Sequence, residues 1–200
     1  MTERRWSILI GRFARDRSGT ATIEFAFIVP IMLVILFGSL ETAELVLAYM
    51  KVEDAAETAA DLVAQTTINT GALQSSAFTN FTNAIEQVLY PLTTSSSNPK
   101  VAYASVTYST GTPVIDWHYE SNGATALTIA NITSVQNLAN LGSETSGSND
   151  SVIVVQLKYT YSSTFSHVLG SSYNLSEWAF NRPRYINCVP TYLNTGSVCP

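Results

Sequence analysis

The chain opens with a basic stretch, which leads into a long apolar run and then an amphipathic pattern. Residues 25–40 contain no charged side chain, and as a helix they span roughly 24 Å. The hydrocarbon core of a bilayer is about 30 Å thick, so a complete span reaches back to Thr20 and takes in Glu24. The run predicts one membrane-spanning helix. Pro30 lies inside it and removes a backbone donor, so we expect a kink there.

The helical pattern continues beyond the apolar run. Apolar or small residues recur at steps of three or four on one face, at Leu45, Tyr49, Val52, Ala56, Ala59 and Val63. No Gly or Pro occurs between Gly38 and Gly71. We therefore expect one helix over about 20–67, transmembrane in its first half and amphipathic in its second. Its alanine stripe (Ala55, Ala56, Ala59 and Ala60) either packs on the chain's own domain or receives another helix.

The remaining residues predict a small α+β domain. Residues 73–90 have helical periodicity and end at Pro91, and residues 121–123 read as a turn. Stretches rich in β-branched and aromatic residues predict strands at 100–109, 114–120, 151–162 and 173–181, with 133–141 ambiguous and possible as a short helix. The fold class is thus α+β, with the long N-terminal helix packed on an antiparallel sheet of about four strands.

Charge is distributed unevenly along the chain. Residues 1–19 hold five arginines and two acids, whereas residues 20–200 hold five basic and thirteen acidic residues. The positive-inside bias places the N-terminus in the cytoplasm and the larger part outside. An acidic outer part argues against nucleic acid as a partner. A cleavable secretory signal is the alternative, but no A-x-A-like site follows the apolar run.

Candidates for catalysis are weak. Ser166 precedes His167 without a G-x-S-x-G elbow, and His118 lies within a predicted strand. Asp116 and Glu120 could share a strand face, although ordinary solvated side chains explain them better. The glycines form no phosphate-binding motif. We expect no enzyme, no cofactor and no metal site.

The only two cysteines, Cys188 and Cys199, lie near the C-terminus and form no C-x-x-C motif. In an oxidising compartment a disulfide between them would staple the tail, which the chain-entropy model values at about 3 kcal/mol.

The junction between leader and apolar run reads Arg17-Ser-Gly-Thr-Ala-Thr-Ile-Glu-Phe25. A basic leader ending in glycine, then four residues, then Glu and an aromatic, resembles the class III signal of type IV pilins in its tight-adherence (Tad/Flp) form. Through about residue 66 the chain is similar to the TadE-like family, including Pro30 and the Ala-rich continuation. The late segment 178–185, with its Arg-Pro-Arg, also resembles the ending of that family.

This resemblance implies a minor pilin-like component, or pseudopilin, of a Tad/Flp type IV pilus involved in adherence. A prepilin peptidase would cut between Gly19 and Thr20, while Glu24 and Phe25 would serve assembly and register. The chain would divide into a cytoplasmic leader (1–19), the TadE-like helix (20–67) and an extracytoplasmic domain (68–200) with a pilin-like fold. Its partners would be the peptidase, other pilins and pseudopilins, the inner-membrane pilus platform and membrane lipid. Its location would be the bacterial inner membrane, crossed once.

Within that scheme, the presence of a carboxylate at position 24 has a physical explanation. An unpaired carboxylate at the edge of hydrocarbon costs on the order of a few kcal/mol. In staggered helices, the new amine of Thr20 in one subunit can pair with Glu24 of its neighbour and fix the axial register. In the competing interpretation, Glu24 is an unpaired acid whose side chain extends to the membrane–water interface. That interpretation belongs to the alternative function, a stand-alone single-pass membrane protein with an extracytoplasmic binding domain.

Overall fold

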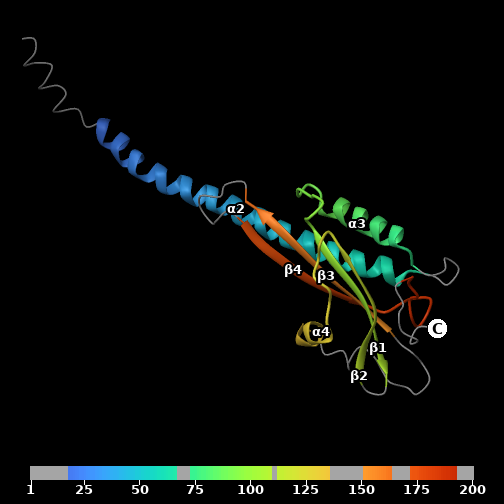
Figure 1. Cartoon of the computed structure of the whole chain (residues 1–200). Coiled ribbons are helices and arrows are strands. Elements are labelled where there is room, and N and C mark those ends of the chain that lie inside the picture. Colours follow the sequence, from blue (N-terminus) through green and yellow to red (C-terminus); the bar gives the residue numbers. More distant parts are fainter. Residues whose placement is uncertain (1–17, 67–72, 110–111, 136–150, 164–171, 193–200) are drawn as a thin grey trace, which may run out of the picture.

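The computed structural model describes residues 18–66, 73–109, 112–135, 151–163 and 172–192. Its dominant element is α2 (Ser18–Ala64), a single helix of 47 residues that continues through Pro30. The N-terminal half of α2 projects away from the rest of the molecule, and its C-terminal half lies against the folded domain (Figure 1). The long helix predicted over about 20–67 is confirmed.

A four-stranded antiparallel sheet forms the centre of the domain, in the order β2-β1-β3-β4. Its strands are β1 (Lys100–Ser109), β2 (Thr112–Ser121), β3 (Ser151–Ser162) and β4 (Ser172–Asn181). The predicted strands are confirmed, although β2 begins two residues earlier than expected. The turn after β2 is also confirmed, with Asn122 and Gly123 both at positive φ, which glycine adopts without strain.

Two helices cover one face of the sheet. The second half of α2 packs on β3 and β4, and α3 (Ser75–Leu89) packs beside it, against α2 and β2 (Figure 1). Alternating strand residues reach this layer because side chains on a strand point to opposite faces in turn. Phe78 of α3 is fully buried and stacks on Tyr119 of β2, with ring centroids 4.3 Å apart.

The opposite face of the sheet carries a second apolar cluster, beneath α4 (Ile129–Val135). Its buried members are Ala102, Ala104, Val106, Leu127, Ile132, Val152 and Val154. The ambiguous segment predicted at 133–141 overlaps α4 only over 133–135, and its other residues lie outside the described part of the chain. The α4 helix thus begins earlier in the sequence than expected, and Ile132 provides its buried contact.

Candidate functional site

The predicted cleavage point lies at the N-terminal end of α2. Gly19 and Thr20 both lie in its first turn and are exposed. A Cβ added to Gly19 would meet no atom within 4 Å, and its φ is not positive. The glycine penalty of roughly 1 kcal/mol relative to alanine applies to helix interiors, whereas Gly19 is the second residue of α2. The described chain therefore offers no packing or conformational reason for a glycine at this position.

Glu24 lies one turn beyond Thr20 and is exposed, as is Phe25. Among the described residues, no hydrogen bond or ion pair involves Glu24. The apolar side chains that follow it on α2 are also exposed, among them Phe27, Ile31 and Ile35. Within the described part of the chain, this carboxylate is therefore left to water, lipid or another chain.

By length and composition, α2 is able to cross a membrane. Its most apolar 18-residue window has a mean hydropathy of 2.4, and none of that window is buried in the molecule. An exposed apolar helix is costly in water, since burial of apolar surface contributes about 25 cal/mol per Å². Anchoring in a membrane removes that cost. The orientation expected from the leader arginines and the kink expected at Pro30 stay predictions.

The second half of α2 is held by the chain's own domain. The alanine stripe is buried at Ala55, Ala56, Ala59 and Ala60, in one cluster with β3, β4 and α3 side chains. Small side chains allow the helix axis to approach the sheet closely. Of the two interpretations of this stripe, the structure favours packing within the domain, so these residues are not available to a second helix.

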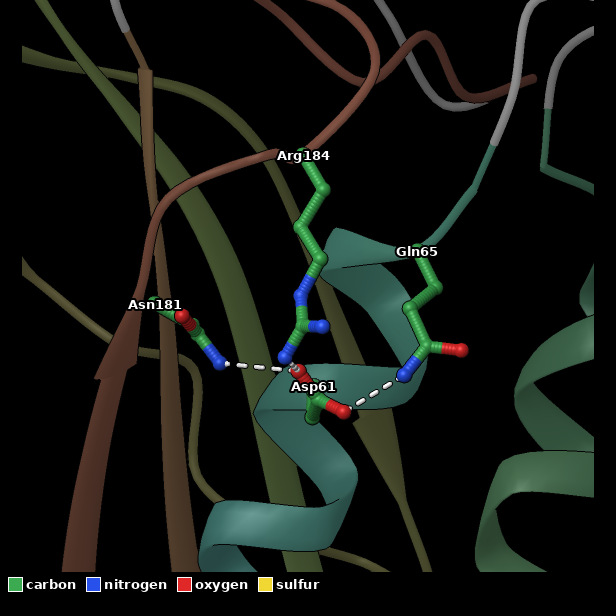
Figure 2. Close-up of polar contacts among 4 residues, drawn as sticks. All are labelled: Asp61, Gln65, Asn181 and Arg184. Carbon is green, nitrogen blue, oxygen red and sulfur yellow. Dashed lines mark hydrogen bonds and ion pairs between the residues drawn. The ribbon is translucent and has the colours of Figure 1, made fainter.

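Polar contacts fix the C-terminal end of α2 to the segment after β4 (Figure 2). The Arg184 guanidinium forms an ion pair with Asp61, and the Arg184 backbone N–H donates to the Ala64 carbonyl at 2.9 Å. Gln65 Nε2 and Asn181 Nδ2 also donate to the Asp61 carboxylate, at 2.5 and 3.3 Å. The Arg-Pro-Arg segment singled out in the sequence thus contacts the helix end, which sequence spacing alone could not show.

The structure separates the candidate catalytic residues. Asp116 is buried and accepts hydrogen bonds from Ser105 and Thr107, whereas Glu120 contacts His118 Nδ1 at 2.6 Å near the surface. Burial raises the pKa of Asp116, and the two hydroxyl donors act in the opposite direction. Asp116 lies where a register irregularity interrupts the β1–β2 pairing, so the expected shared face is wrong.

Other candidates lie partly outside the described residues. Ser166 and His167 fall in the segment 164–171, and Cys199 falls beyond residue 192. The disulfide between Cys188 and Cys199 therefore stays a prediction. Within the described ranges, no group of three or more His, Cys, Asp or Glu side chains could hold a metal ion.

Sequence reasoning missed a group of residues where α2 leaves its exposed apolar half. Glu41 is 1% exposed and accepts a hydrogen bond from Ser163. One turn further, Glu44 accepts from the Tyr161 hydroxyl at 3.4 Å. Burial, followed by the nearby Glu44 charge, raises the pKa of Tyr161, so its hydroxyl stays protonated and donates. These partners are more than 110 residues apart in the sequence, so no local pattern could indicate that they are in contact.

Comparison with known proteins gives one family. The model of the TadE-like protein family matches residues 19–61, which run from the predicted cleavage glycine to the acid at the end of α2. This match confirms the resemblance drawn from the junction sequence and the apolar run. No curated protein and no solved structure matches the chain.

Proposed function

Because residues 19–61 match the TadE-like family, we propose that this chain is a minor pilin-like component of a Tad/Flp type IV pilus. TadE-like proteins form a structural family related to the Tad pilus, and the exposed apolar half of α2 fits membrane anchoring. In the proposal the protein crosses the bacterial inner membrane once, with its N-terminus in the cytoplasm and its α+β domain outside. Its function is to help assemble the pilus, without catalysis.

Gly19 supports processing by a prepilin peptidase. The space around it is open, so a side chain would be tolerated by the fold itself. Because the described fold does not require a glycine at this position, recognition by a peptidase supplies a reason for it. Cleavage after Gly19 removes the leader arginines and leaves a free amine on Thr20, within one helical turn of Glu24.

The observation that carries the proposal is the isolation of Glu24. Its carboxylate is exposed at the start of an apolar helix and has no partner among the described residues. Sister helices in a fibre supply the Thr20 amine, which pairs with the carboxylate and sets one axial register. Other pilins, pseudopilins and the inner-membrane platform are the partners that this arrangement requires.

The test is the substitution Glu24→Ala in cells that express the pilus genes. We expect pili to be lost from the sheared surface fraction, while the protein remains in the membrane fraction. The reason is that the substitution removes the inter-subunit pairing but makes membrane insertion easier. Glu53→Ala, an exposed acid further along α2, is the matched control and should leave piliation unchanged. Normal piliation of the Glu24→Ala strain would contradict the proposal.

The second candidate is a stand-alone membrane protein with an outer binding domain. Such a protein needs only an anchor and a well-packed outer domain, and the sheet domain is well packed. The substitution Gly19→Arg separates the two. Under the first proposal it blocks maturation, whereas under the second it has no effect on the size or location of the protein.

A further inference from the structure

The positions of two acids on α2 indicate where the hydrocarbon layer ends. Glu24 and Glu44 are separated by twenty helical steps, or about 30 Å, which equals the thickness of the hydrocarbon core. Between them Glu41 is shielded by the domain rather than exposed to lipid. Glu44 and about one turn after it therefore lie at the level of the lipid headgroups, in a layer about 5–7 Å deep.

Exposed apolar and aromatic side chains continue beyond Glu44. Leu47 is 59% exposed and Met50 is 54% exposed, and Tyr90, in the loop after α3, is 77% exposed. Tyrosines gather at this end of the domain, since Tyr161 lies against Glu44 and Tyr49 interacts with Glu177. Tyrosine is enriched at membrane–water interfaces because its ring is apolar and its hydroxyl is polar. The edge of the domain nearest the exposed half of α2, called the rim below, thus has the composition of an interfacial surface.

A cleft of about 340 Å³ opens in this rim, between α2, the loop after α3 and the end of β3. Its walls are mainly apolar, with Leu47 and Ala48 from α2 and Leu92 from the loop. The Tyr159 ring closes one side, held by a hydrogen bond from its hydroxyl to the Thr93 carbonyl at 2.8 Å. The volume is within the range of small-molecule sites.

One cation faces this cleft. Lys51 Nζ donates to the Val88 carbonyl at 3.3 Å, which uses one of its three donors. A helical side chain leans toward the N-terminus of its helix, so this ammonium lies closer to the membrane than its own Cα. Glu44 at the opposite end of the cleft already accepts from Tyr161. The cleft therefore presents an apolar channel with one positive group, whose Cα lies seven helical steps or about 10 Å beyond Glu44, at the outer edge of the headgroup layer.

We propose that this cleft binds a membrane phospholipid, with the phosphodiester on Lys51 and the glycerol end and first acyl carbons along Leu47, Ala48 and Leu92. Glu44 lines the same cleft as the single lysine, so the acid and the base together favour a zwitterionic headgroup over a net anionic one. The inference rests on the membrane anchoring in the proposed function and is independent of a role in pili. Bound lipid would fix the height and rotation of the domain above the bilayer.

The experiment uses the full chain in nanodiscs of phosphatidylethanolamine or phosphatidylglycerol, followed by release into detergent and native mass spectrometry. We expect retained phosphatidylethanolamine on the natural chain, and about tenfold less on the Lys51→Gln variant, since a charge-assisted hydrogen bond is lost. Leu47→Asp, at an exposed wall position, should lose the lipid as well. Lys100→Gln, on an exposed strand lysine outside the cleft, is the control and should retain it. Unchanged melting temperatures confirm that the variants are folded.

Several results would overturn the inference. These are equal retention by Lys51→Gln and the natural chain, equal loss by Lys100→Gln, or stronger retention of phosphatidylglycerol than of phosphatidylethanolamine. A photo-crosslinking residue at position 47 separates lipid from protein as occupant, because the mass of its adduct in membranes identifies the neighbour. A lipid adduct supports the inference, and an adduct with another polypeptide contradicts it. Neither result depends on whether the cells make pili. The lipid-binding inference and the proposed function are therefore tested independently of each other.

Discussion

At the scale of single residues, three acids of this chain have different surroundings and different consequences. Glu24 is exposed on an apolar helix, Asp61 is paired with Arg184, and Asp116 is buried among hydroxyl groups. The role of Glu24 in assembly is a prediction from its spacing to Gly19. The burial of Asp116 was not predicted, because it depends on a register irregularity between β1 and β2 that has no local sequence signal.

Asp116 gives a testable dependence of stability on pH. Its side chain is 7% exposed, and Oδ1 has no hydrogen-bond partner within the described structure. Burial raises its pKa above the ordinary value of an aspartate. A raised folded-state pKa means that the contribution of this group to stability is fully present below the unfolded pKa and is lost as pH rises through the folded pKa.

We therefore expect Asp116→Asn to gain stability relative to the natural chain as the pH increases from about 4 to 7. The measurement is denaturant unfolding of the full chain in detergent at a series of pH values. Glu57→Gln, at an exposed acid on α2, is the control and should show a much smaller trend. A stability difference that stays constant across this pH range would contradict the interpretation.

At the scale of elements, the helices and strands were predicted well from residue type and from the spacing of apolar side chains. Apolar side chains at steps of three or four located α3 and the second half of α2, and stretches rich in β-branched and aromatic residues located all four strands to within a few residues. Strand order was not predicted, since long-range pairing leaves no local pattern. The cleft and its residues were missed for the same reason, as Glu44 and Tyr161 are distant in sequence but adjacent in the fold.

The end of α2 provides a prediction at this scale. Asp61 is an acid near a helix C-terminus, which the helix dipole disfavours, and the Arg184 guanidinium offsets that charge. Both side chains are partly exposed, so the ion pair is worth little on its own. A double-mutant cycle of Asp61→Ala and Arg184→Ala should give a coupling of about 0.5–1 kcal/mol that weakens at high salt. Coupling near zero at low salt would show that the contact does not stabilise the helix end.

At the scale of the whole molecule, α2 joins two environments. Its first half is exposed along its length and suited to lipid, and its second half completes the core of the sheet domain (Figure 1). Because one helix without a break serves both parts, the membrane half and the domain are joined with no loop between them. This rigid connection is what a subunit needs if the packing of its helix is to set the position of its outer domain.

The most direct test of the central claim is the mass of the chain in its own cells. The claim is that this protein enters the pilus pathway through cleavage at Gly19. In cells with the prepilin peptidase, intact-mass measurement should give a product that begins at Thr20, whereas cells without the peptidase, and the Gly19→Arg variant, should retain the leader. A chain that begins at Met1 in peptidase-positive cells would contradict the claim and leave a tethered outer domain as the better description.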